Sequence, residues 1–154
     1  MKKTRISLGA DHAGFVLKKE IQTLLEKLGC DVLDRGTHNG DRVDYPDYAA
    51  VVARDVQDGK ANYGIICCGT GIGMAITANK FRGIRAASIV DEYSLLMARK
   101  HNDLNVLCLG SRVIGGGTAM LLVETFLKTD FEGERHQERL DKITELENLL
   151  CVKS

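Results

Sequence analysis

The sequence predicts an α/β fold, a single-domain, doubly wound sheet of five parallel strands with a C-terminal helix. Short apolar runs alternate with stretches of helical periodicity along the whole chain, a pattern typical of parallel sheets. A length of 154 residues suits one domain, and no linker, repeat or low-complexity block divides it. We therefore expect one domain over residues 1–154, with the common strand order 2-1-3-4-5.

The first half of the chain carries three predicted strands and two helices. Residues 5–9 form the first strand, and the helix after it ends at Gly29, a typical C-terminal cap. A second strand over 30–34 leads through a polar loop to a helix that Asp47 caps and Gly59 ends. Residues 63–68 are nearly all apolar, as expected for a strand that is buried on both faces. The apolar stripes of the two helices are Leu17, Ile21, Leu24, Leu25 and Leu28, then Tyr48, Val51, Val52 and Val56.

The second half continues the alternation. The predicted elements are a turn over 69–73, a helix through Lys80, a strand over 85–90, a helix capped by Asp91 that runs to His101, a strand over 105–110 and a helix over 118–128. The last helix, about 134–150, has one apolar stripe made of Leu140, Ile143, Leu146 and Leu150. This stripe packs either on its own sheet or on a second subunit, and the sequence leaves both open.

Composition excludes several function classes. Lys plus Arg and Asp plus Glu each number 21, so the net charge of +0 gives no general attraction to nucleic acid or to anionic membranes. The long uncharged segment 62–79 contains too many glycines for a transmembrane helix, and the basic start precedes no apolar stretch of signal-peptide length. Five unevenly spaced cysteines do not form a disulfide framework. The sequence predicts a soluble, cytoplasmic protein with reduced thiols.

Two polar loops are expected to meet at one edge of the sheet. Residues 9–14 follow the first strand and residues 68–73 follow the third, and these strands are neighbours in the predicted order. The glycine-rich turn over 69–73 offers several backbone N–H groups at a helix start, which suits an anion or a transient oxyanion. The turn equally suits a plain tight crossing from strand to helix. It is not a dinucleotide fingerprint, because Met74 occupies the sixth position.

Cys68 is the candidate nucleophile or general base, because a helix N-terminus favours the thiolate form of a cysteine beside it. Its alternative is a small buried hydrophobe, the interpretation we give to the other four cysteines, Cys30, Cys67, Cys108 and Cys151. The four histidines show no metal-binding spacing, so no metal site is expected. Among them, His12 lies in the first loop and His101 ends a helix.

Arg135 and Arg139 are four residues apart and therefore share one face of the last helix. Together with Arg112 after the fifth strand, they are candidates for a phosphate clamp. The alternative is a solvated charged face that includes Glu134 and Glu138.

Taken together, motifs along nearly the whole chain resemble ribose-5-phosphate isomerase type B, in collinear order. The family also includes galactose-6-phosphate isomerase and isomerases of allose and tetrose phosphates. The matching stretches are Gly9-Ala10-Asp11-His12-Ala13-Gly14, Asp44-Tyr45-Pro46, Cys68-Gly69-Thr70-Gly71-Ile72-Gly73, Ala78-Asn79-Lys80, His101-Asn102-Asp103, Gly110-Ser111-Arg112 and Gly133-Glu134-Arg135-His136-Gln137-Glu138-Arg139.

The resemblance implies interconversion of ribose 5-phosphate and ribulose 5-phosphate through an enediolate, without metal or other cofactor. It implies that Cys68 is the base that removes a carbon-bound proton and that Thr70 assists it. It implies that His101 donates the proton that opens the sugar ring, with Asp11 taking part. The remaining substrate-binding residues would be Gly69, Gly71, Ile72 and Gly73 for the oxyanion, His12, Arg112, Arg135 and Arg139 for the phosphate, Asn102 for the sugar and Tyr45 for the pocket wall.

Family members are dimers or tetramers with shared active sites, which implies that His101, Asn102 and Arg112 act on the neighbouring subunit's substrate. One subgroup has a glutamate base just past the glycine turn, where this chain has Met74, and that departure favours Cys68. Three alternatives stay open: the same chemistry on another sugar phosphate, a nucleotide-binding or regulatory module, and a Cys–His hydrolase.

Overall fold

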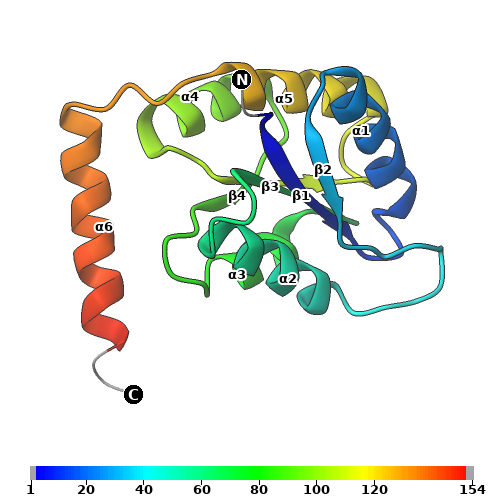
Figure 1. Cartoon of the computed structure of the whole chain (residues 1–154), viewed down its shortest axis with the longest axis horizontal. Helices are drawn as coiled ribbons and strands as arrows, with labels where there is room; N and C mark the ends of the chain where they lie inside the picture. The colour runs from blue at the N-terminus through cyan, green and yellow to red at the C-terminus, as the bar shows by residue number, and fades with distance from the viewer. Residues whose placement is uncertain (1–2, 152–154) are drawn as a thin grey trace.

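The computed structural model describes residues 3–151 as a five-stranded parallel sheet between two layers of helices (Figure 1). The predicted fold class is confirmed, including the C-terminal helix. The strands are β1 (Arg5–Ala10), β2 (Asp31–Asp34), β3 (Tyr63–Cys68), β4 (Ala86–Ser88) and β5 (Val106–Gly110). The helices are α1 (Phe15–Lys27), α2 (Tyr45–Gln57), α3 (Ile72–Ala78), α4 (Glu92–Asn102), α5 (Gly116–Lys128) and α6 (Arg135–Cys151).

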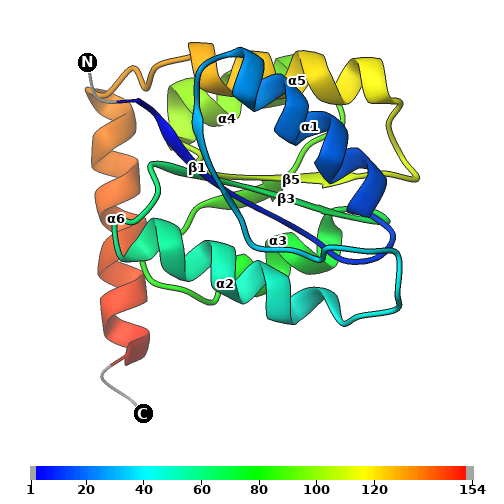
Figure 2. The same cartoon turned by 45° about the vertical axis from the view of Figure 1, so that its right-hand side comes forward.

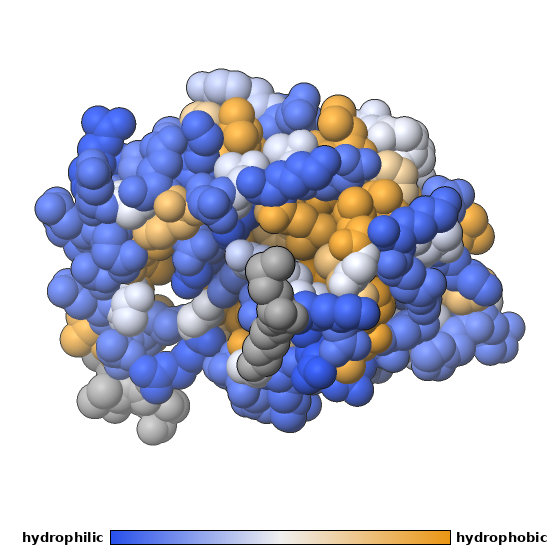
Figure 3. All heavy atoms as spheres, turned by 45° about the horizontal axis from the view of Figure 1, so that its top comes forward, coloured by the Kyte–Doolittle hydropathy of each residue, from blue (hydrophilic) through white to orange (hydrophobic). Residues whose placement is uncertain are grey.

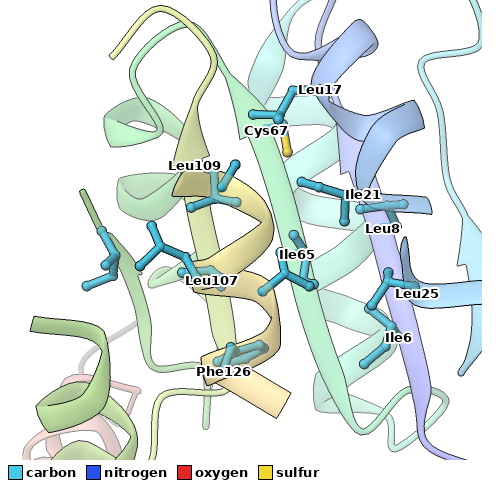
Figure 4. Packing of buried hydrophobic residues seen from close by; sticks show 14 of the residues in the cluster. Ile6, Leu8, Leu17, Ile21, Leu25, Ile65, Cys67, Leu107, Leu109 and Phe126 are labelled. Carbon is cyan, nitrogen blue, oxygen red and sulfur yellow. The ribbon is translucent and has the colours of Figure 1, made fainter. Parts of the chain in front are cut away.

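Two apolar clusters fill the spaces between the layers. On one face, Ile65 of β3 and Leu107 of β5 pack with residues of α1 and α5 such as Ile21 and Phe126 (Figure 4). On the other face, α2 and α3 cover the sheet, as the turned view shows (Figure 2). The cluster there includes the Cys68 side chain. Since adjacent residues of a strand face opposite sides, Cys67 and Cys68 belong to different clusters.

The strand order is 2-1-3-5-4, so the predicted order 2-1-3-4-5 is wrong at one edge. β5 is buried along its whole length and pairs with both β3 and β4. β4 has only three residues, all half-buried, instead of the predicted 85–90. An interior strand needs apolar side chains on both faces, whereas a short, less apolar strand is suited to the edge.

Most helix ends lie where the sequence predicts them. Gly29 and Gly59 follow α1 and α2 with positive φ angles, and the Asp91 carboxylate accepts a hydrogen bond from the Ser94 N–H at the start of α4. The start of α2 is a correction, because Asp44 occupies the N-cap position and Asp47 lies inside the first turn. Proline is favourable in the first helical turn, where its missing N–H would have no partner, so Pro46 begins the helix earlier than expected.

Helix α6 lies at the end of the sheet opposite the carboxyl ends of the strands (Figure 2). Only Leu140 of its predicted apolar stripe is buried, against a groove of about 310 Å³ that Ile84, Ala87 and Ala98 help to line. The rest of the stripe is exposed: Ile143, Leu146 and Leu150, together with Leu149. Residues of α4, of β4 and of the segment before β4 therefore cover one end of the stripe and leave the remainder open.

Polar residues dominate the outline of the molecule, and apolar residues gather near the centre of the face that Figure 3 shows.

Within residues 3–151, no helix combines the length and the apolar character that crossing a membrane requires.

Candidate functional site

Cys68 and the glycine turn form the centre of the candidate site. Cys68 is the last residue of β3, and its register partner is Gly110 at the end of β5. The Cys68 Sγ accepts a hydrogen bond from the Gly71 N–H at 3.1 Å, so the thiol faces the amides of the turn. The residue is 5% exposed, which leaves the sulfur sheltered at the sheet edge. The Thr70 Oγ1 accepts from the Ile72 N–H at 3.3 Å, where α3 begins.

Neighbouring strands hold the turn in place through its carbonyl groups. The Ser111 N–H donates to the Cys68 carbonyl at 2.9 Å, and the Arg112 N–H donates to the Gly69 carbonyl at 3.0 Å. The Ser88 hydroxyl donates to the Thr70 carbonyl at 3.0 Å. The turn is therefore preorganised by the ends of β4 and β5, which a site that stabilises transient charge requires.

Gly71 is a position at which this turn tolerates no side chain. Its φ of 77° is left-handed, and a Cβ atom there would lie 2.7 Å from the Ser88 Oγ and 3.1 Å from the Leu109 carbonyl carbon. We expect Gly71→Ala to lower the free energy of unfolding by about 1–3 kcal/mol and to abolish most activity, because the backbone must shift. Urea denaturation and turnover assays measure both effects.

Gly29→Ala is the matched control, since Gly29 has φ 78° but no heavy atom within 4 Å of the added Cβ. That variant should lose only the stability cost of the left-handed backbone and keep full activity. Equal turnover by the two variants would contradict the assignment of the turn to the site.

The loop after β1 contacts the same edge, as the sequence predicts. The Asp11 N–H donates to the Cys67 carbonyl at 3.2 Å, and the buried Asp11 carboxylate accepts from the Gly14 N–H at 3.0 Å. A Cβ on Gly14 would lie 2.2 Å from the Cys67 oxygen, so glycine allows this close approach. The His12 ring is held by the backbone of Val43, with its Nδ1 3.2 Å from the Val43 oxygen.

Tyr45 and Arg112 lie on two sides of the turn. A Cβ on Gly73 would fall 2.6 Å from the Tyr45 ring, and a Cβ on Gly69 would fall 3.5 Å from an Arg112 guanidinium nitrogen. Side chains at these glycines would therefore meet the ring and the cation. We call the combined set the carboxyl-edge site; it consists of Asp11, His12, Tyr45, residues 68–73 and Arg112.

The other predicted site residues lie at the opposite edge of the same subunit. Helix α4 runs antiparallel to the strands, so His101 and Asn102 end beside the start of β5, and the Asn102 carbonyl accepts from Arg85 just before β4. Arg135 and Arg139 are exposed at the start of α6, which is also at that end (Figure 2). The structure thus divides the predicted residues into two groups.

The structure places Arg112 apart from His101 and Asn102, with which the resemblance implies that it acts on a neighbouring subunit's substrate. Arg112 lies with its guanidinium group against the turn of its own subunit. Its backbone bond to Gly69 requires this, because Arg112 directly follows the end of β5 beside β3.

The second group contains a feature that sequence reasoning missed. The rings of His101 and His136 stack with centroids 4.1 Å apart and planes 8° from parallel. The Glu132 carboxylate lies 3.8 Å from the His101 Nε2 and 3.7 Å from the His136 Nε2. The four-residue spacing of Glu132 and His136 was the only sequence signal for it. We call Glu132, His101 and His136 the histidine stack.

The other described cysteines are unsuited to base catalysis. Burial raises the pKa of the Cys67 thiol and that of Cys108, and both are fully enclosed. Cys30 is half-buried and not fully buried as we expected, and burial raises its pKa as well. The side chain of Cys151 lies outside the described residues. Among the described cysteines, only Cys68 accepts a hydrogen bond from the turn through its sulfur atom.

Known proteins resemble this chain over nearly its full length. Residues 6–143 match the family described as Ribose/Galactose Isomerase. Ribose-5-phosphate isomerase B of Escherichia coli is 48% identical over 143 residues, 93% of this chain and 96% of that protein.

Solved structures agree with the sequence match. Ribose-5-phosphate isomerase B of Clostridium thermocellum superposes with a TM-score of 0.94 and 47% identity, over 96% of this chain and 99% of that one. The Mycoplasma genitalium enzyme with bound ribulose 5-phosphate gives a TM-score of 0.91 and 41% identity, over 96% and 99%. The chain therefore belongs to the ribose/galactose isomerase family, with ribose-5-phosphate isomerase B enzymes among its relatives.

Proposed function

We propose that this protein is a metal-independent aldose–ketose isomerase that interconverts ribose 5-phosphate and ribulose 5-phosphate, with Cys68 as general base. The observation that carries the proposal is the hydrogen bond from the Gly71 N–H to the Cys68 sulfur at the start of α3. A thiolate there is close to backbone amides that can also donate hydrogen bonds to an oxygen of the substrate as it becomes negatively charged. The names of the E. coli and C. thermocellum relatives support the choice of substrate.

The reaction begins with a weakly acidic proton on the carbon next to the substrate carbonyl. Cys68 takes this proton, and the electron pair moves onto the carbonyl oxygen to give an enediolate. One good N–H donor to such an oxyanion is worth about 3 kcal/mol, and the turn over 69–73 provides several. The Cys68 thiol then returns a proton to C1, and the O2 hydroxyl proton moves to O1, which gives the ketose. Thr70 assists this transfer between the oxygens, because its hydroxyl lies in the same turn.

Two subunits complete the site in this proposal. His12 and Arg112 of one subunit and Arg135 and Arg139 of the other hold the phosphate, while His101 opens the sugar ring and Asn102 holds the sugar. The exposed remainder of the α6 stripe supports an interface between copies, because Leu146 is 62% exposed and its apolar neighbours are similarly open. We propose a homodimer as the smallest active unit.

The proposed base requires a free thiol, which suits the reducing cytoplasm. The substrate range is tested by supplying ribose 5-phosphate, allose 6-phosphate and galactose 6-phosphate in the presence of a chelator and following ketose formation. We expect the highest kcat/KM for ribose 5-phosphate. A preference for a hexose phosphate would move the protein to another branch of the family, and loss of activity with chelator would contradict metal independence.

Arg135→Ala tests the phosphate clamp. Its loss should raise KM for ribose 5-phosphate by about tenfold or more, since hydrogen bonds from a charged donor are worth about 1.5–3 kcal/mol. Lys142→Ala, an exposed cation further along the same helix, is the control and should leave KM unchanged. An unaltered KM in Arg135→Ala would remove this residue from the clamp.

A further inference from the structure

We infer that Glu132 and His136 are positioning residues for His101, which fix the plane of its ring and hold a negative charge beside it. The inference rests on the proposed function, in which His101 opens the sugar ring. It explains two side chains to which neither the sequence motifs nor the proposed chemistry gives a task.

The stack restricts the His101 ring to one plane. His136 is only 4% exposed, so neighbouring atoms hold its ring in place. The His101 ring stacks on it with the ring centroids 4.1 Å apart, and the His101 side chain is partly exposed to solvent. Loop 129–134 is also fixed to α4, because the Glu132 N–H donates to the Lys100 carbonyl at 3.0 Å. The orientation of the His101 ring is therefore restricted both by the His136 ring and by the loop that carries Glu132.

The charges around the stack favour one distribution of protons. Burial lowers the pKa of His136, and the positive charges of His101, Arg135 and Arg139 lower it further. A hydrogen bond from Lys100 lowers the pKa of Glu132, with added effects from His101 and His136. At neutral pH, His136 is accordingly neutral and Glu132 is ionised. A neutral ring therefore lies below His101 and a carboxylate lies beside it, which holds a negative charge next to the group that donates to a sugar oxygen in the proposed function.

A buried polar atom also requires an explanation. The Nδ1 of His136 has no hydrogen-bond partner among the described residues, and such atoms are rare because they lose the hydrogen bonds of water. A phenylalanine would fill the same space without this cost. His136→Phe is therefore expected to fold, and it separates the effect of the flat ring from the effect of its polar atoms.

The same three side chains bring possible metal ligands within 4.8 Å of one another. A metal ion lies in the plane of an imidazole that binds it, and two stacked rings whose planes are 8° from parallel do not direct their nitrogens at one such point. This arrangement therefore fits stacking and charge better than coordination.

The test separates ring opening from proton abstraction. Ribose 5-phosphate is mostly cyclic, whereas erythrose 4-phosphate cannot close a furanose ring, because its terminal hydroxyl carries the phosphate. Ribulose 5-phosphate is open for the same reason, and its exchange of a C1 hydrogen with D2O needs no ring opening. Turnover of ribose 5-phosphate, turnover of erythrose 4-phosphate and this exchange are compared at saturating substrate.

We expect His136→Leu to lower ribose 5-phosphate turnover by about 10- to 100-fold, because a misplaced acid loses its alignment. Exchange and erythrose 4-phosphate turnover should stay within about twofold of the unchanged protein. His136→Phe, which keeps a flat ring below His101, should recover most of the lost turnover. Glu132→Gln should also lower ribose 5-phosphate turnover and spare the other two reactions, because the His101 ring loses the negative charge beside it.

Glu124→Gln and His38→Leu are the controls, since Glu124 pairs with Lys128 on α5 and the His38 side chain is 72% exposed. Both should match the unchanged protein. Equal losses in all three reactions, or unchanged ribose 5-phosphate turnover in Glu132→Gln, would overturn the inference alone. Absence of exchange in the unchanged protein would overturn the proposed function and this inference with it.

Discussion

Cys68→Ser is expected to lose about 100- to 10,000-fold in kcat for ribose 5-phosphate, the contribution of a well-placed general base. A serine hydroxyl occupies nearly the same position beside the Gly71 N–H, so the turn keeps its shape. At neutral pH, however, the hydroxyl has almost no anionic form to accept a carbon-bound proton. Affinity for a phosphate-bearing inhibitor should stay nearly unchanged, because the clamp residues are not altered. Steady-state kinetics and calorimetric titration measure the two quantities.

Cys67→Ala is the matched control, since the neighbouring thiol faces the opposite cluster, against α1 and α5. It should lower stability slightly and keep turnover. A fully active Cys68→Ser, or equal losses in the two variants, would show that the base lies elsewhere.

A mixed dimer is expected to recover activity from two inactive parents. Cys68→Ser and His101→Asn variants, carrying different tags, are co-expressed, and the mixed dimer is isolated through both tags. If Cys68 and His101 come from different subunits, one of the two sites in this dimer has both residues intact. The mixed dimer should then show about half the wild-type activity, as two-fold symmetry requires.

The separation of the two groups within one subunit is the physical basis of that result. Cys68 ends β3 at the carboxyl edge, and His101 ends α4 at the other, so no side-chain rotation brings them together. A mixed dimer as inactive as its parents would place both residues in one site of one chain. A monomeric protein with full activity would exclude a shared site altogether.

The sequence was sufficient for the fold class and for the meeting of two loops at one edge of the sheet, because both depend on local patterns. The apolar run over 63–68 predicts an interior strand, and a glycine-rich turn directly follows it. The order of β4 and β5 depends on which strand is buried on both faces, a property of packing between distant segments. The strand Ala86–Ser88 is short and partly polar, so its hydrophobic pattern is too weak to predict that it lies at the edge of the sheet.

The resemblance implied one group for Arg112 and His101, whereas their elements place them apart. Arg112 follows a strand and His101 ends a helix, which puts them at opposite edges. Glu132 belongs to no recognisable motif, and its role depends on the loop that returns the chain to α4. Such contacts follow from tertiary structure alone.

Transfer of solvent hydrogen into the substrate is the most direct test of the central claim that the Cys68 sulfur takes a carbon-bound proton beside the amides of the turn. Ribulose 5-phosphate is incubated in D2O with the unchanged protein or with Cys68→Ser, and deuterium at C1 is followed by NMR. The account predicts rapid incorporation by the unchanged protein and a loss in Cys68→Ser as large as the loss of turnover. Incorporation by Cys68→Ser at the unchanged rate would contradict it.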